Sequence, residues 1–85
     1  MKNIQVVSAS WCGYCRAAKG FLDKLELAFE EIDVTNDDGL RNKWSKKANN
    51  HPTIPMVFIG GVFIGGYTEL VGAQKSGKLE KLLNS

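Results

Sequence analysis

The sequence predicts one α/β domain spanning residues 1–85, with a four-stranded mixed sheet and helices on both faces. Three observations predict this class. The chain begins with a strand–helix–strand pattern, which requires a right-handed crossover and a parallel pair. Two apolar runs joined by Gly60-Gly61 indicate an antiparallel hairpin. The order β-α-β-α-β-β-α gives a sheet whose two faces are buried under helices.

The first half of the chain supplies two strands and two helices. Residues 2–8 are an apolar run typical of a buried strand. Residues 13–27 predict a helix, because the apolar stripe is one-sided: Ala18, Phe21, Leu22, Leu25 and Ala28. Residues 29–34 predict a second strand, with Phe29, Ile32 and Val34 pointing inward. The run Asn36-Asp37-Asp38-Gly39 favours a turn that caps a short polar helix over 39–48.

The second half predicts a loop, a hairpin and a helical region. Residues 49–55 contain two prolines and read as a loop. The hairpin strands are residues 56–59 and 62–64, and the two glycines between them tolerate the positive φ that such turns need. Gly65-Gly66 ends the hairpin. A final helical region carries Leu70 through Leu83, with a break near Gly77.

Composition limits the classes of partner. The chain is 44% hydrophobic, which is ordinary for a globular fold, and its net charge is +2 from 11 basic and 9 acidic residues. This balance does not indicate binding to nucleic acid or to a membrane surface. The N-terminus does not resemble a secretion signal, and no apolar stretch approaches membrane-spanning length. We therefore expect a reducing compartment, the cytoplasm.

The most informative motif is Trp11-Cys12-Gly13-Tyr14-Cys15, which contains the only cysteines. At the first turn of a helix, residues i and i+3 lie on one face, so the two sulfurs can meet. The free N–H groups at that end stabilise a thiolate, which is the reactive nucleophile. The motif predicts a thiol–disulfide redox site. We expect Trp11 to be a hydrophobic shield beside it.

A structural metal site is the weaker interpretation of the cysteine pair. Zinc requires about four ligands, and His51 is the only further candidate. We therefore expect no bound zinc and a solvent-exposed His51.

Five motifs follow one another along the chain: Cys12-Gly13-Tyr14-Cys15, Thr53-Ile54-Pro55, Phe58-Ile59-Gly60-Gly61, the run from Ile64 to Leu70, and Gly77-Lys78-Leu79-Glu80. In these motifs the chain resembles the glutaredoxins nearly end to end. This resemblance implies a thioredoxin-like fold in which a cis Ile54–Pro55 bond faces the cysteines. It also implies that the backbone of Ile54 serves as a short edge for an incoming peptide, glutathione.

The resemblance implies a role for each site residue. Cys12 is the nucleophile that attacks the glutathione sulfur of a mixed disulfide, and Cys15 is the less exposed resolving thiol. Gly66, Tyr67 and Thr68 hold the γ-glutamyl carboxylate at a helix N-terminus, where Thr68 is also the expected N-cap. The expected glutathione-binding residues are Tyr14, Arg41, Thr53, Ile54, Pro55, Gly66, Tyr67 and Thr68.

Two positions depart from the family pattern. Many members carry a basic residue shortly before the first cysteine, where this chain has Ser8-Ala9-Ser10. We expect Arg41, rather than Lys46, to meet the glycine carboxylate of glutathione, with weakened rather than abolished binding.

The second departure is Gly13, which replaces the commoner proline of the tetrad. Family members with a small residue there, including single-cysteine relatives, can hold a [2Fe–2S] cluster between two subunits, through the first cysteine and glutathione.

These features predict a glutathione-dependent thiol–disulfide oxidoreductase. Its expected partners are glutathione and glutathionylated or disulfide-containing proteins such as ribonucleotide reductase, and we expect a monomer unless a cluster bridges two chains. One alternative is a dimeric [2Fe–2S] carrier or sensor that uses Cys12. Another is a glutathione-independent redoxin that serves ribonucleotide reductase.

Overall fold

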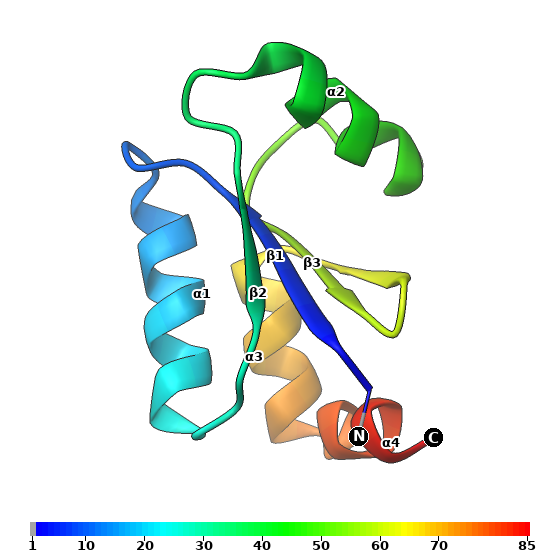
Figure 1. Cartoon of the computed structure of the whole chain (residues 1–85). Coiled ribbons are helices and arrows are strands. Elements are labelled where there is room, and N and C mark those ends of the chain that lie inside the picture. Colours follow the sequence, from blue (N-terminus) through cyan, green and yellow to red (C-terminus); the bar gives the residue numbers. More distant parts are fainter. Residues whose placement is uncertain (1) are drawn as a thin grey trace.

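The computed structural model describes residues 2–85 as three layers, with one mixed sheet between helices (Figure 1). The predicted fold class is confirmed. The last helical region is two helices that meet at Gly77, as the sequence indicated. The elements are β1 (Ile4–Ser8), α1 (Gly13–Lys24), β2 (Glu30–Asp33), α2 (Asp38–Lys47), β3 (Met56–Ile59), β4 (Val62–Gly65), α3 (Tyr67–Lys75) and α4 (Lys78–Asn84).

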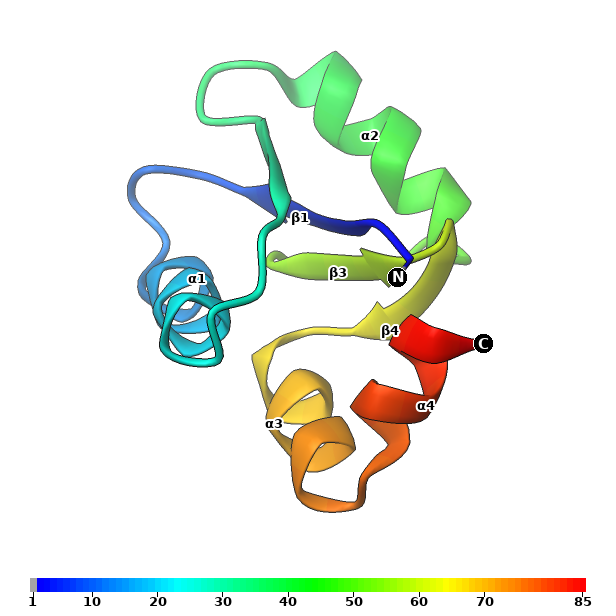
Figure 2. The ribbon, with the colours of Figure 1, turned by 60° about the horizontal axis from the view of Figure 1, so that its bottom comes forward.

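The sheet has the strand order β2-β1-β3-β4. β1 pairs in parallel with β2 and antiparallel with β3, and β3 and β4 form the predicted hairpin. Gly60 and Gly61 have φ of +58° and +83°, which is the left-handed geometry that a tight hairpin turn requires. In Figure 2, the hairpin lies between β1 and the pair α3–α4. The central strands are therefore covered on both sides.

Alternation along the strands gives each face its own core. On β1, Ile4 and Val6 point toward α1, α3 and α4, whereas Val7 points toward α2. On the second strand, Phe29 packs on the α1 side, while Val34 packs on the α2 side. The predicted inward residues of this strand thus pack into two different clusters, in which Val34 is buried and Phe29 and Ile32 are half-buried. Burial of these side chains from both faces is the main stabilising contribution to the fold.

Helix α1 ends earlier than the apolar stripe predicted. Its last residue is Lys24, and Glu26 follows with φ of +58°. The Leu27 N–H donates to the Leu22 carbonyl at 3.0 Å, a 6→1 bond that closes the helix. Ala28 is exposed, so its predicted place on the helical stripe is wrong. The chain must reverse here to enter β2 parallel to β1.

Helix α2 begins where the capping residues predicted. Asp37 is the N-cap, and its Oδ1 accepts the Leu40 N–H at 2.9 Å. The helix is otherwise polar, and it contacts the sheet through Leu40 and Trp44, which pack against Phe58 and its neighbours. None of the helices within residues 2–85 is long and apolar enough to cross a bilayer.

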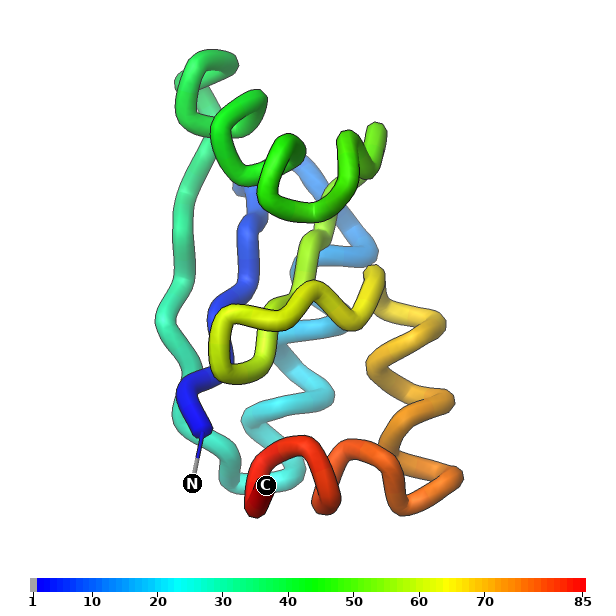
Figure 3. Tube along the Cα trace, turned by 90° about the vertical axis from the view of Figure 1, so that its right-hand side faces the viewer, coloured from blue at the N-terminus to red at the C-terminus, as the bar shows by residue number. Residues whose placement is uncertain are grey.

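The beginning of the described chain lies beside its last helix (Figure 3). The Lys2 N–H donates to the Leu83 carbonyl at 2.8 Å, and Leu83 and Leu79 of α4 are buried in the same cluster as Ile4. Helix α4 thus closes the end of the core farthest from the loop that follows β1. Helix α4 does not cover the loops at the other end of β1, which lead to the two cysteines.

Two Gly→Ala substitutions should change stability in opposite directions. Gly20 lies within α1, and nothing lies within 4 Å of the position that an alanine Cβ would take, so Gly20→Ala should stabilise by about 0.5–1 kcal/mol. Gly65 has φ of +126°, and a Cβ there would lie 2.6 Å from the Glu69 Cβ, so Gly65→Ala should destabilise by more than about 1 kcal/mol. Urea unfolding of both variants measures the two changes. Equal shifts would contradict the backbone assignment at Gly65.

Candidate redox site

The two cysteines lie where β1 leaves the sheet and α1 begins. Cys12 is the N-cap of α1, with φ −97° and ψ 113°, and Cys15 is in the first turn. The Cys12 N–H donates to the Ala9 carbonyl at 3.2 Å, which folds the connecting loop tightly. The fold therefore presents the first sulfur at the N-terminal end of a helix, as the sequence predicted.

The first sulfur accepts a backbone hydrogen bond. The Cys15 N–H donates to Cys12 Sγ at 3.1 Å, and the Cys12 Sγ lies 3.8 Å from the Ile54 carbonyl, to which the thiol form can donate. Cys12 is 8% exposed and Cys15 is 0% exposed. The order of exposure confirms that Cys15 is the less accessible thiol. Only Cys12 can meet an external disulfide directly.

The second sulfur is held as a thiol. The pKa of Cys15 is raised from 9.0 to about 12, mainly by burial and then by the hydrogen bond with Cys12, although a backbone hydrogen bond with Ala9 and the charge of Lys19 oppose this rise. A thiol is a poor nucleophile until it loses its proton. Cys15 is thus suited to a second, intramolecular step rather than to the first attack.

The loop before β3 approaches the cysteines from the other side. The Ile54–Pro55 peptide bond is cis, as the resemblance implied. Ile54 also packs against the small cluster formed by Ala9, Cys12 and Cys15. The backbone of Ile54 therefore lies directly beside the accessible sulfur.

A pocket of about 200 Å³ lies next to this loop. It brings together seven of the eight predicted glutathione-binding residues from three separate segments of the chain. Its lining residues are Tyr14, His51, Thr53, Ile54, Pro55, Gly66, Tyr67, Thr68 and Glu69. Motifs that are forty residues apart in sequence thus form one concave surface.

The start of α3 forms one side of the pocket. Gly66, not Thr68, is the N-cap, and its N–H donates to Glu69 Oε1 at 2.7 Å. The predicted N-cap role of Thr68 is therefore wrong. A Cβ on Gly66 would lie 3.3 Å from the Pro55 carbonyl oxygen, so the chain enters the helix here in close contact with the cis-proline loop. Thr68 is exposed within the first turn.

Arg41 is the predicted residue that does not line the pocket. It lies on α2, and its Nη2 donates to the Pro52 carbonyl at 3.3 Å. Pro52 immediately precedes Thr53, so the guanidinium group lies beside the loop that leads into the pocket. The structure thus places this cation near the predicted groove without bringing it into the lining.

Two lining residues were not predicted. His51 is half-buried rather than exposed: its ring lies 5.0 Å from that of Phe63, and its Nε2 is 3.1 Å from Thr53 Oγ1. Asn49 and Asn50 have positive φ, of 57° and 62°, and they turn the chain at the end of α2. This turn precedes the contact of His51 with Phe63 of β4, and the composition of the loop did not predict it. Glu69 accepts the Gly66 N–H from the first turn of α3, and the sequence did not signal this contact because a glycine N-cap lacks the side-chain oxygen of the usual capping box.

Exposed aromatic side chains flank the accessible sulfur. Trp11 is 61% exposed and Tyr14 is 68% exposed. The ring centroids of Tyr14 and Tyr67 lie 6.2 Å apart, which links the cysteine turn to the start of α3. Trp11 precedes Cys12 directly, and its large exposed fraction shows that it does not cover the site by packing against the core.

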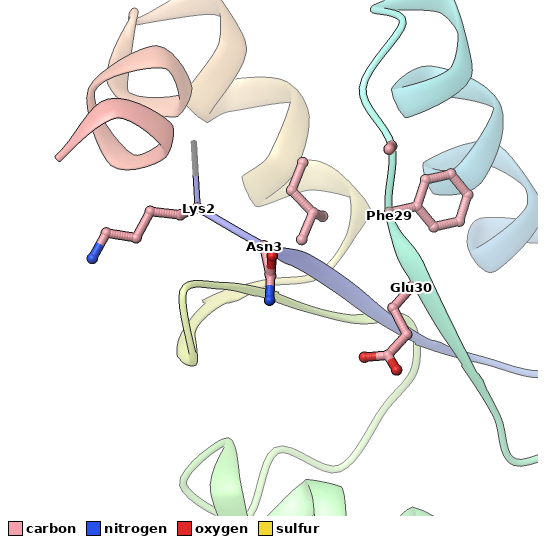
Figure 4. A pocket seen from close by; sticks show the side chains of 6 residues that line it. Lys2, Asn3, Phe29 and Glu30 are labelled. Atoms are coloured by element: carbon pink, nitrogen blue, oxygen red, sulfur yellow. The ribbon is translucent and has the colours of Figure 1, made fainter.

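A larger pocket of about 460 Å³ lies at the opposite end of β1 (Figure 4). Its lining includes Lys2, Asn3, Phe29 and Glu30 and contains no cysteine. Within residues 2–85, no three His, Cys, Asp or Glu side chains gather as a metal site. The cysteine turn and the smaller pocket are therefore the site that the described residues support.

A family model described as Glutaredoxin matches residues 4–64, which run from β1 into β4 and include both cysteines. The chain belongs to the glutaredoxin family. It is 36% identical over 84 residues to glutaredoxin 1 of Rickettsia prowazekii (strain Madrid E), covering 98% of this chain and 88% of that protein. It is 32% identical over 85 residues to a glutaredoxin of Pseudomonas aeruginosa, and each protein is covered completely.

Solved glutaredoxin structures share the fold. The buckwheat glutaredoxin–glutathione complex matches with a TM-score of 0.86 at 29% identity, covering 98% of this chain and 77% of that one. Glutaredoxin 1 of Francisella tularensis complexed with cacodylate matches with a TM-score of 0.78 at 26% identity, and both chains are covered completely. The fold is thus thioredoxin-like, and this glutaredoxin, with its CxxC pair, is a thiol–disulfide oxidoreductase.

The buried thiol should make stability depend on alkaline pH. Folding raises the pKa of Cys15 from 9.0 to about 12. The stabilisation that the protonated thiol gives to the folded state is therefore complete below pH 9 and is lost as the pH rises toward 12. The free energy of unfolding of the reduced protein should therefore fall more steeply from about pH 9 to about pH 12 than that of Cys15→Ala. Urea titrations under reducing conditions compare the two. If the free energy of unfolding fell equally with pH in both proteins, Cys15 would not keep its proton in the folded state at alkaline pH.

Proposed function

We propose that this glutaredoxin is a glutathione-dependent oxidoreductase that reduces protein–glutathione mixed disulfides and protein disulfides. The observation that carries the proposal is the position of the accessible Cys12 sulfur, 3.8 Å from the Ile54 carbonyl and next to a pocket lined by Ile54, Tyr67 and Thr68. The backbone of the cis-proline loop can pair with an extended tripeptide. The fold match to a glutaredoxin–glutathione complex supports the choice of ligand.

The pocket offers complementary groups to the two ends of glutathione. Helix geometry leaves the N–H groups of Tyr67 and Thr68 without intrahelical partners, and these can receive the γ-glutamyl carboxylate. The Gly66 N–H is already bonded to Glu69. At the other end, Arg41 beside Pro52 is the cation that we assign to the glycine carboxylate. Ser8-Ala9-Ser10 supplies no positive charge before the first cysteine.

The two thiols divide the reaction into steps. The Cys12 thiolate attacks the glutathione sulfur of a mixed disulfide, the protein thiol leaves, and Cys12 becomes glutathionylated. The thiolate of a second glutathione then attacks the glutathione sulfur of this new disulfide. This step regenerates the Cys12 thiolate and yields glutathione disulfide. With a protein disulfide as substrate, the mixed disulfide on Cys12 is resolved by Cys15. The exposure order of the two sulfurs supports these roles.

A glutathione-independent redoxin uses the same cysteine pair without a tripeptide site. The pocket at Tyr14, Ile54 and Tyr67 favours the glutathione-dependent function, because a redoxin reduced by another protein has no need of it. Turnover of a glutathione mixed disulfide, driven by glutathione and its reductase, separates the two. The redoxin alternative predicts a rate close to background.

The described residues do not by themselves fit a [2Fe–2S] cluster. Such clusters take four thiolate-type ligands, and this chain offers the accessible Cys12 with a buried Cys15. The position of a Cβ on Gly13 is open, since nothing outside the neighbouring backbone lies within 4 Å of it. The remaining ligands must come from a second chain and from glutathione. The cluster-bridged dimer stays a prediction, which anaerobic reconstitution with glutathione tests through visible absorbance and oligomeric state.

We further propose that the protein acts as a monomer in a reducing compartment, such as the cytoplasm, where glutathione maintains the thiols. Its substrates are then glutathionylated proteins and enzymes that form a disulfide in each cycle, of which ribonucleotide reductase is one. An even charge balance, +2 overall, supports a small thiol cofactor rather than nucleic acid or a membrane as partner.

Replacing each cysteine should separate the two activities. Cys12→Ser should reduce both deglutathionylation and protein-disulfide reduction to background, because it removes the nucleophile. Cys15→Ser should keep deglutathionylation and lose protein-disulfide reduction, because a second glutathione replaces the resolving thiol only in the first reaction. Coupled assays with glutathione and glutathione reductase measure both. Deglutathionylation by Cys12→Ser would overturn the proposed function.

Removing the proposed carboxylate partner should weaken glutathione binding modestly. Arg41→Ala should raise the KM for glutathione by up to about fivefold, as expected for one partly exposed ion pair of about 1 kcal/mol or less. Lys43→Ala on the exposed side of α2 is the matched control and should leave the KM unchanged. Equal KM values for both variants would remove Arg41 from the glutathione site.

A further inference from the structure

A polar network lies on the α1 side of the sheet, close to the cysteine turn. Ser8 Oγ donates to Glu31 Oε2 at 2.5 Å, and Lys19 Nζ lies 2.7 Å from the same oxygen. The three residues come from β1, β2 and α1. Ser8 is 0% exposed, and it is the polar residue buried among the described core positions. The mechanism proposed above uses none of these groups.

Strand alternation explains why the three side chains meet. Ser8 lies on the same face of β1 as Val6, which contacts the α1 cluster, and Glu31 lies on the same face of its strand as Phe29. Helix α1 covers this face and presents Lys19 toward it. The pairing is therefore set by the sheet register rather than by chance contact of surface side chains.

Lys19 is four residues after Cys15 on α1, one helical turn along the same face. Its charge lowers the pKa of the Cys15 thiol, less than the backbone hydrogen bond with Ala9 does and against the larger effect of burial, and its hydrogen bond lowers the pKa of Glu31. The Glu31 carboxyl group thus remains ionised at neutral pH. The charged groups that act on Cys15 are then Cys12 and Lys19, and Lys19 is the one that favours its thiolate.

This balance changes during the reaction. When Cys12 enters a mixed disulfide, it no longer carries the negative charge that disfavours a second thiolate beside it. Burial then remains as the main factor that opposes ionisation of Cys15, and Lys19 remains as the cationic side chain that favours it. The step at which Cys15 must lose its proton is therefore the step at which Lys19 matters most.

We propose that Lys19 is a positioning residue for the intramolecular step, in which its ammonium group promotes attack by Cys15 and its ion pair with Glu31 moderates that effect. The inference rests on the proposed function. In this step, the Cys15 S–H bond breaks and the Cys15 sulfur attacks the Cys12 sulfur. The bond between Cys12 and glutathione breaks, and the departing glutathione thiolate takes up a proton. Cys15 is oxidised and the glutathione sulfur is reduced.

The expected effect is small but has a distinctive sign. A lower pKa increases the thiolate fraction and decreases its nucleophilicity, with a Brønsted coefficient of about 0.4–0.5, so only about half of the change on a logarithmic scale reaches the rate. Lys19→Met should therefore slow the intramolecular step about threefold for a tenfold loss of thiolate. Glu31→Gln removes the opposing negative charge and should accelerate the same step about twofold.

The experiment mixes the reduced protein rapidly with glutathione disulfide, quenches with acid, and counts species by mass spectrometry. The first phase forms the mixed disulfide on Cys12, and the second forms the Cys12–Cys15 disulfide. Lys24→Met is the control for charge on the same helix, and Glu30→Gln is the control on the same strand, where Glu30 accepts from Gln5 Nε2 at 2.7 Å. Lys19→Arg should restore the wild-type rate.

The two phases separate failure of the inference from failure of the proposed function. Slower second-phase kinetics in Lys19→Met and faster kinetics in Glu31→Gln, with unchanged first phases, would support the role. Equal second phases in Lys19→Met and Lys24→Met would overturn it, as would slowing by both Lys19→Met and Glu31→Gln, since loss of packing alone slows both. A wild-type protein that forms no mixed disulfide would instead overturn the proposed function.

Discussion

The hydrogen bond from the Cys15 N–H to Cys12 Sγ is the interaction on which the site depends. It forms because β1 delivers the chain to the N-terminus of α1 at Cys12, where the first N–H groups of the helix have no intrahelical acceptors. The same helical turn places Cys15 beneath Cys12 and buries it. One local geometry therefore places the two thiols in different environments: Cys12 is slightly exposed and accepts a backbone hydrogen bond, whereas Cys15 is fully buried.

The sheet then builds the binding surface around that turn. The antiparallel pairing of β1 with β3 brings the loop ending in Ile54–Pro55 against Cys12, and the β3–β4 hairpin returns the chain so that α3 starts beside Pro55. The pocket belongs to no single segment. Its position beside the accessible sulfur agrees with membership of the glutaredoxin family and with the fold match to a glutaredoxin–glutathione complex.

Charge on the opposite side of the cysteine turn completes this arrangement. The Ser8–Glu31–Lys19 network connects β1, β2 and α1 through one carboxylate oxygen. None of its three residues lines the pocket, yet its cation is four residues after Cys15, one helical turn along α1. The cysteine turn thus has the pocket on one side and this polar network on the α1 side of the sheet.

Local sequence determined much of this protein. The glycine pair at 60–61, the Asp37 cap and the CxxC spacing each fix a backbone geometry through their own side chains or through the lack of one, so they could be predicted directly. Only the tertiary structure decided where α1 ends, that Gly66 rather than Thr68 caps α3, and that His51 lies against Phe63. Those outcomes depend on contacts between segments distant in sequence, and no local pattern records which partner a side chain will meet.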